Sequence, residues 1–304
     1  MKLSITYLYT IMKYGYPPKP EDDFSAFEEI RGMGFRYLEM EGLGPDHAQS
    51  VRTNLKEYQK ALKDAGIHVH NFCIVDPDLV SLDSGKRSIA CENYRRMIEV
   101  GAALEAETFH LASYAPPVHY SGRKPYQLDG GGYEFGSKAS IAIPDGFDWQ
   151  RVWEVLVESA RFCAEAAKEH GRIVLMEPRV GETICSVDSL IRLLDDAGCE
   201  NLMANFDTGH FSAQRENVCL ALMKLKGRFA NIHISDNIPQ NAEHIAVGKG
   251  SIDWMEFFRL LKAMEYRGYL GLDLGGGETL VDDLIQSRSY ISEIAGKTNC
   301  TLEW

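Results

Sequence analysis

The feature that most constrains the fold is a regular alternation of short apolar runs with longer amphipathic stretches along the chain of 304 residues. Eight runs are rich in β-branched or aromatic residues, as buried strands are; they cover 3–9, 35–40, 67–75, 107–113, 172–178, 202–207, 229–236 and 269–276. In the intervening stretches, apolar residues recur at spacings of three and four, which predicts amphipathic helices. We expect helices at 22–34, 54–66, 92–106, 148–171, 186–198, 218–227, 253–268 and 279–296.

The ends of these stretches carry residues typical of helix boundaries. Ser186 and Asp253 stand where an N-cap accepts a backbone hydrogen bond. Many stretches end at a glycine, the residue that best adopts the left-handed conformation after a helix. These glycines are Gly34, Gly66, Gly171, Gly198, Gly227 and Gly268.

Strands that alternate with helices indicate parallel strands joined by crossovers, and eight such units in this length fit a (β/α)8 TIM barrel. The competing fold, a doubly wound open sheet, needs a reversal of strand order and usually a glycine-rich phosphate loop after the first strand. The segment YLYTIMKYGYPP (7–18) contains no such loop. We therefore expect an α/β protein in which residues 1–304 form one TIM-barrel domain.

One segment breaks the alternation. Residues 112–147 are rich in Gly, Pro and Tyr and greatly exceed the usual length of a strand-to-helix loop. The segment follows a strand, on the face where barrels carry their active sites. We expect an insertion over the C-terminal face, serving as an active-site lid or a subunit contact; a passive surface insertion is the alternative.

Charge and cysteine content limit the partners. Asp and Glu outnumber Lys and Arg by 44 to 32, and the net charge of −12 disfavours nucleic acid and anionic membranes. Seven scattered cysteines without a CxxC pair suggest neither a disulfide framework nor a zinc ribbon, which favours a reducing cytoplasm. The start MKLSITYLYTIMKYG faintly resembles a signal peptide, but polar residues interrupt it, so we expect a buried first strand.

Four polar side chains follow apolar runs at neighbouring strand ends. They are Glu177, Asp207, His233 and Asp273. A charged group inside a barrel is costly unless it is paired or bound to a metal, and carboxylates crowded together repel one another. Taken singly, each residue fits a cap or a satisfied core position. Together, three carboxylates and one imidazole predict a site for one divalent cation, with Mn²⁺ favoured and Mg²⁺, Co²⁺ or Zn²⁺ as alternatives.

The second half of the chain resembles the xylose isomerase-like barrel family of sugar isomerases and epimerases, which includes the ketose 3-epimerases. The similar segments are MEPRVGE (176–182), FDTGH (206–210), IHISD (232–236), EHIAVGKGSIDW (243–254) and GYLGLDLGG (268–276). The resemblance implies a (β/α)8 fold and a metal held by the four residues above. It also implies proton abstraction next to a sugar carbonyl through an enediolate that the cation stabilises.

The same resemblance implies further site residues. Substrate-binding or supporting roles fall on Arg179, Glu182, His210, Asp236 and His244. The catalytic residues would be Glu177 and Asp273. However, the ketose epimerases have Glu where this chain has Asp273, and the shorter carboxylate retreats by about 1.5 Å, one carbon–carbon bond. His110 or His70, near the ends of two earlier strands, is then an alternative base, although both also fit as core histidines.

Several functions remain open from the sequence. Epimerisation and isomerisation of a small carbohydrate are favoured, and a lyase of the same family is the alternative. The long loop and Asp273 look more like the C-glycoside deglycosidase catalytic subunits, which would imply a small partner subunit over the barrel mouth; inosose dehydratases are a second lyase type. A homo-oligomer and a non-catalytic sugar-binding barrel also remain. Endonuclease IV-type enzymes share the barrel, but one carboxylate of their zinc set is missing at Ala242 and the acidic charge argues against DNA.

Overall fold

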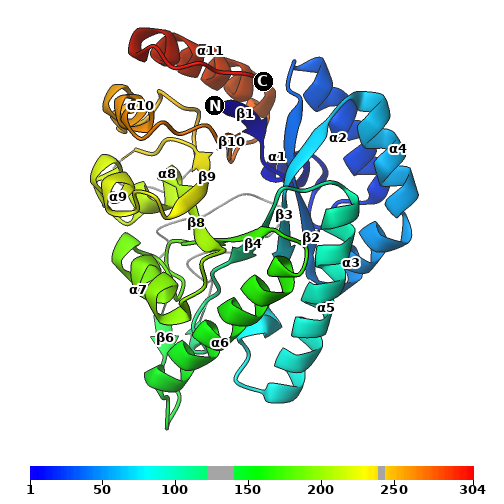
Figure 1. The fold of residues 1–304 in the computed structure, drawn as a ribbon, viewed down its shortest axis with the longest axis vertical. Helices are drawn as coiled ribbons and strands as arrows, with labels where there is room; N and C mark the ends of the chain where they lie inside the picture. Colours follow the sequence, from blue (N-terminus) through cyan, green and yellow to red (C-terminus); the bar gives the residue numbers. More distant parts are fainter. Residues whose placement is uncertain (122–139, 239–243) are drawn as a thin grey trace.

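Eight parallel strands close into a barrel at the centre of the computed structural model, which describes residues 1–121, 140–238 and 244–304. Neighbouring strands follow the chain in order and the last pairs with the first, so the (β/α)8 fold is confirmed (Figure 1). The strands are β1 (Lys2–Ile5), β2 (Tyr37–Leu43), β3 (His68–Val75), β4 (Thr108–Ala112), β7 (Ile173–Glu177), β8 (Leu202–Asp207), β9 (Phe229–Ile234) and β10 (Tyr269–Leu272).

Helices surround the barrel (Figure 1). They are α1 (Leu8–Tyr14), α2 (Pro20–Gly32), α3 (Gly44–Thr53), α4 (Leu55–Ala65), α5 (Ser84–Ala103), α6 (Trp149–Lys168), α7 (Val187–Ala197), α8 (Thr208–Ala213), α9 (Val218–Lys224), α10 (Trp254–Ala263) and α11 (Leu280–Thr298), with a 3-10 turn, η1 (Pro77–Val80). None of the helices in the described ranges combines the length and apolar character needed to cross a membrane. All seven cysteines are free thiols.

The helix ends agree with the sequence at most positions. Ser186 and Asp253 are N-caps, and their side chains accept from the backbone N–H of the third helical residue. Gly66 and Gly198 end their helices in the left-handed conformation. The prediction for Gly268 is wrong, because α10 already ends at Ala263 and the left-handed residue is Glu265, with φ 55°.

Three helices near the strand ends were not expected from the sequence. The first predicted strand, 3–9, stops at Ile5, and Leu8 already belongs to α1. The hydroxyl of Thr6, the residue after β1, contacts the carbonyl of Leu272 and the carboxylate of Asp273. Helices α3 and α8 likewise begin directly after their strands.

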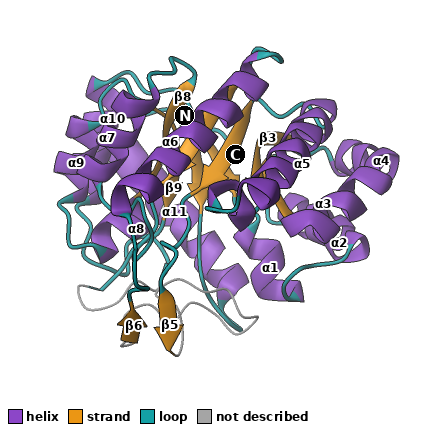
Figure 2. Ribbon diagram, turned by 90° about the horizontal axis from the view of Figure 1, so that it is seen from below, coloured by secondary structure: helices purple, strands orange, loops and turns teal. Residues whose placement is uncertain are grey.

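The predicted insertion leaves the barrel as a two-stranded antiparallel hairpin, β5 (His119–Ser121) and β6 (Ser140–Ala142). The hairpin projects from the body of the protein (Figure 2). The middle of the predicted insertion, residues 122–139, lies outside the described residues.

Polar side chains fill much of the inside of the barrel, while the apolar core lies between the strands and the helices. Alternate residues of a strand share a face, so the pairs Glu39 and Glu41, or Asn205 and Asp207, belong to one face of their strands. The register between β2 and β3 shifts after Leu38, and the extra β3 residue brings Asn71 opposite Glu39. The regular pairing of β2 with β3 is therefore interrupted beside Glu39 and Asn71, where polar side chains converge.

A buried cluster ties α1 to the helices around it. The carboxylate of Asp23 on α2 is fully buried and accepts hydrogen bonds from the hydroxyls of Tyr7, at 2.5 Å, and Tyr58. Burial raises the pKa of Asp23 to about 6, although these two hydrogen bonds favour the ionised form. Tyr7 immediately precedes α1, so this cluster fixes the start of that helix.

We predict that Asp23 makes stability fall as the pH rises from about 4 to about 6. The folded state retains a proton on Asp23 over this range, whereas the unfolded state has lost it; folding therefore binds a proton and is opposed by higher pH. A shift of about 2 pH units corresponds to about 3 kcal/mol. Urea unfolding of wild type and Asp23→Asn at several pH values should show this difference in slope; parallel pH profiles would contradict it.

Candidate functional site

A pocket of about 260 Å³ opens at the C-terminal ends of the strands. Its polar floor consists of Glu39, His110, Glu177, His233 and Asp273. One side is an apolar wall formed by Leu8, Ile11, Leu43, Val75 and Val80. The pocket therefore combines a charged, buried floor with a surface that excludes water.

Three of the four predicted metal ligands come together here; Glu177 and His233 line the pocket, and Asp207 is fully buried next to them and is not a lining residue. One ligand atom from each of Glu177, Asp207 and His233 lies within 4.8 Å of the others. His233 Nδ1 is 2.8 Å from Glu177 Oε1 and 3.6 Å from Asp207 Oδ2. The ends of β7, β8 and β9 lie side by side, which explains why residues 26 or more positions apart meet here.

The fourth predicted ligand, Asp273, lines the same pocket but is held by other groups. Its Oδ1 accepts from the Thr6 hydroxyl at 2.7 Å, and its Oδ2 lies 2.9 Å from His244 Nδ1. Asp273 is not part of the group that brings Glu177, Asp207 and His233 together. Its place among the ligands stays a prediction.

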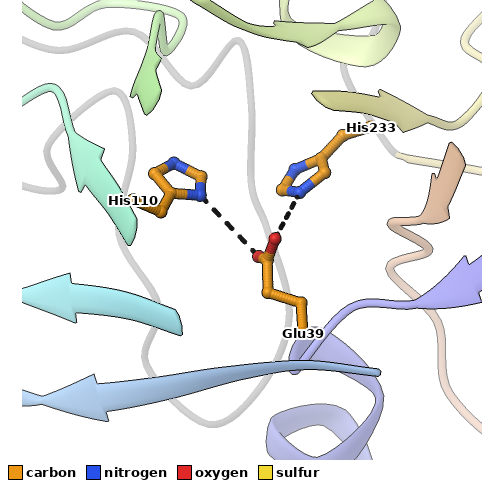
Figure 3. Close-up of side chains that lie close together, drawn as sticks. All are labelled: Glu39, His110 and His233. Carbon is orange, nitrogen blue, oxygen red and sulfur yellow. Dashed lines mark hydrogen bonds and ion pairs between the residues drawn. The ribbon is translucent and has the colours of Figure 1, made fainter. Parts of the chain in front are cut away.

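Glu39 is a floor residue that the sequence reasoning missed. Its carboxylate lies between two imidazoles, with Oε2 3.0 Å from His233 Nε2 and Oε1 3.8 Å from His110 Nδ1 (Figure 3). The signal was present, because Glu39 interrupts the apolar run FRYLEM in the way that Glu177 ends its own run. Glu39 lies in the first half of the chain, outside the segments that resemble the sugar isomerase family.

His110, predicted as a catalytic base, lines the pocket from β4. Its Nε2 lies 3.6 Å from Glu177 Oε2. Burial opposes a charged imidazole, but Glu177 and Glu39 outweigh it and raise the pKa of His110 to about 9.

A second glutamate on β2, Glu41, also lines the pocket and was missed from the sequence. Burial and the nearby charge of Glu39 raise its pKa to about 8. Because Glu41 and Glu39 are two residues apart on one strand, both carboxylates belong to the same face of β2.

Arg179 and Glu182 line the pocket, as the resemblance implies. Arg179 Nε donates to Glu177 Oε2 at 2.7 Å, and Asn205 Nδ2 donates to Glu177 Oε1 at 2.8 Å. Burial alone would raise the pKa of Glu177, but Arg179 and His110 lower it well below the ordinary value. Glu177 is thus held as an oriented carboxylate.

His210 and His244 are buried and are not among the residues that line the pocket, although His244 contacts the lining residue Asp273. The backbone N–H of His210 donates to Asp207 Oδ1 at 2.7 Å, and its ring meets the edge of His244 at 4.8 Å between centroids. Burial lowers the pKa of His210 to about 4. Burial opposes charge on His244 as well, but Asp273 raises its pKa to about 9.

The structure does not bring Asp236 or His70 to the pocket. Asp236 accepts from the indole of Trp254 at 2.8 Å and from the backbone N–H of Gly248 at 3.0 Å, so it shapes the turn after β9. His70 is the third residue of β3, well before the C-terminal end of that strand. Its ring stacks on Tyr269 and its Nε2 lies 3.0 Å from Ser4 Oγ.

The donor set fits a divalent cation. Asp207 Oδ2 is buried and has no hydrogen-bond partner within the described residues, although an ionised oxygen is costly to bury alone. It faces His233 Nδ1 at 3.6 Å, beside Glu177 Oε1. Two carboxylates and an imidazole suit Mn²⁺, Co²⁺ or Zn²⁺, and the carboxylates suit Mg²⁺.

We predict that Gly209→Ala destabilises the protein by about 1–3 kcal/mol through overpacking behind the floor. A Cβ atom at Gly209 would come within 3.1 Å of His244 Cε1 and 3.2 Å of Asp207 Oδ1, and would overlap the hydroxyl of Ser235. The matched control is Gly277→Ala, where a Cβ atom meets nothing within 4 Å. Equal melting temperatures of the two variants would contradict the close packing.

Comparisons with known proteins find relatives of low sequence identity. Hydroxypyruvate isomerase of Escherichia coli K12 is 24% identical over 135 residues, covering 43% of this chain and 51% of that protein. Inosose dehydratase of Clostridium perfringens is 24% identical over 167 residues, covering 48% and 55%. The chain thus spans about half the length of these curated relatives.

The fold comparison extends over nearly the whole chain. A solved structure described as a D-tagatose 3-epimerase-like protein superposes with a TM-score of 0.75 at 18% identity, covering 98% of both chains, which shows a shared fold. The family described as "Xylose isomerase-like TIM barrel" matches residues 27–291. The chain therefore belongs to the xylose isomerase-like TIM-barrel family.

Proposed function

We propose that this protein is a divalent-metal-dependent isomerase or epimerase that moves a proton next to the carbonyl of a small carbohydrate. The observation that carries the proposal is the buried cluster of Glu177, Asp207 and His233, of which Glu177 and His233 line the pocket. The unpartnered Asp207 Oδ2 within that cluster supports a cation there.

In this proposal Glu177, Asp207 and His233 hold the cation, and Asp273 is a fourth ligand. When bound, the cation polarises the substrate carbonyl and stabilises the negative charge that develops as the neighbouring proton leaves. Mn²⁺ is the favoured ion. Asn205 and Arg179 orient Glu177, and the N–H of His210 orients Asp207.

The proton is moved by side chains that reach the pocket. His110 holds or transfers a proton at Nε2, which lies on the floor 3.6 Å from Glu177 Oε2. Glu41 and Glu182 line the same pocket and accept hydrogen bonds from substrate hydroxyls. The apolar wall excludes water beside the reacting carbons.

The charge of the lining favours a substrate without phosphate. Of the ionisable side chains that line the pocket among the described residues, five are carboxylates and the guanidinium of Arg179 is committed to Glu177 at 2.7 Å. The described lining therefore lacks the cluster of Arg and Lys side chains that usually binds a phosphate.

We predict that the purified protein binds one Mn²⁺ per chain and that Glu177→Gln abolishes turnover without unfolding the protein. The amide removes a charged ligand and the ion pair with Arg179. Elemental analysis, calorimetry and circular dichroism test these outcomes. Full activity of the variant, or no bound metal after Mn²⁺ addition, would contradict the proposed centre.

The apolar wall favours a second candidate, a lyase of the same family. Leu8, Ile11, Leu43, Val75 and Val80 offer a surface for an apolar substituent next to the reactive floor. Loss of a proton beside a carbonyl can then expel a group from the next carbon, either water or the aglycone of a 3-oxo-glycoside.

We predict that incubation in D₂O with Mn²⁺ distinguishes the two reactions. Epimerisation of a free ketose places deuterium at the carbon that inverts, because the proton exchanges with solvent, and leaves the sugar intact. Elimination releases water or an aglycone from a 3-oxo-glycoside. Nuclear magnetic resonance and mass spectrometry detect both. Binding without turnover of either class would favour a non-catalytic sugar-binding barrel.

A further inference from the structure

The two ring nitrogens of His233 face different carboxylates. Nδ1 lies 2.8 Å from Glu177 Oε1, toward the proposed metal centre, whereas Nε2 lies 3.0 Å from Glu39 Oε2 on the opposite side. A neutral imidazole has one N–H donor and one lone pair, and an ionised carboxylate can only accept. A nitrogen that ligates a cation must present its lone pair, so the other nitrogen must carry the hydrogen.

Glu39 is itself held as an acceptor from the neighbouring strands. Asn71 Nδ2 on β3 donates to the same Oε2 atom of Glu39. The orientation of that amide is set by the Thr108 hydroxyl on β4, which donates to Asn71 Oδ1 at 2.9 Å. Glu39 and Asn71 are both almost fully buried, and such contacts are stronger in a protein interior than in water.

We propose that Glu39 is a positioning residue that fixes His233 with its hydrogen on Nε2 and its lone pair on Nδ1, aimed at the metal centre. The inference rests on the proposed function, because it assigns the supporting contact of a ligand in that centre. Carboxylates that accept from the far nitrogen of a ligating histidine set the ring orientation and increase its basicity.

A cation between Glu39, His110 and His233 is the competing arrangement, since these three residues also approach one another. Asn71 argues against it. Its amide N–H groups point at Glu39 Oε2 and lie 3.4 Å from His110 Nδ1, so donor hydrogens occupy the space that such a cation would need. Glu39 therefore acts through His233.

The first test is Mn²⁺ affinity, measured by calorimetry on wild type, Glu39→Gln and a matched control. The introduced amide keeps the shape of the side chain, but its neutral oxygen is a weaker acceptor for which Asn71 and His233 compete, so we expect Mn²⁺ binding to weaken about 10–100-fold. The control is Glu107→Gln, which alters an equivalent contact, 2.9 Å from Glu107 Oε1 to His68 Nε2, outside the pocket. It should bind Mn²⁺ as wild type does.

Thermal unfolding in the presence of a chelator shows whether the Glu39→Gln variant is folded.

A second test determines the protonated nitrogen of His233 by nuclear magnetic resonance and uses the wild-type protein. In wild type labelled with ¹⁵N-histidine and loaded with Zn²⁺, two-bond ¹H–¹⁵N spectra should show His233 protonated at Nε2; His233→Gln assigns its signals among the nine histidines. A hydrogen on Nδ1 of His233, or an unchanged Mn²⁺ affinity of the folded Glu39→Gln variant, would overturn the positioning role of Glu39 but not the metal centre. Failure of wild type to bind either ion would overturn the metal centre with it.

Discussion

The structure depends on the pairing of carboxylates with imidazoles inside the barrel. Transferring an ionised group from water into a protein interior costs several kcal/mol unless partners replace the lost hydration. Glu39 meets this cost through His233 and Asn71, and Glu177 through Arg179 and Asn205. Asp207 is the exception, with one oxygen capped by a backbone N–H and the other buried without a donor in the described part of the chain. That unpartnered oxygen is the feature that supports the proposed cation.

Strand geometry explains why these groups converge. Alternate residues share a face, so Asn205 and Asp207 project together, as do Asn231 and His233. The register between β8 and β9 shifts after Ala204, which places Asn231 opposite Asn205 and His233 opposite Asp207. The Asn231 amide then donates to Asn205 Oδ1 at 2.9 Å, and the Asn205 amide donates to Glu177. A bulge thus aligns a chain of amides that orients a predicted ligand.

Much of the architecture was predictable because periodicity records which residues are buried. All eight barrel strands follow the apolar pattern, as do α2, α4, α5, α6, α7, α9, α10 and α11, and Ser186 and Asp253 mark real helix starts. Helix α1 was misread as strand because its apolar residues, Leu8 and Ile11, face a pocket rather than a sheet neighbour. Periodicity distinguishes buried from exposed residues, but it does not show whether buried residues cover a core or a cavity.

The candidate site was only partly predictable, for a different reason. Strand-end position identified Glu177, Asp207 and His233, which do meet, but it gave His70 and His110 equal weight. The two histidines differ in how far along their strands they lie. His110 pairs with Cys73, nearer the C-terminal end of β3, whereas His70 is the extra residue at the β2–β3 bulge. A sequence shows which face of a strand a residue belongs to more readily than how near it lies to the end of the strand. Position along the strand decides whether an imidazole reaches the pocket or, like His70, packs against Tyr269 inside the barrel.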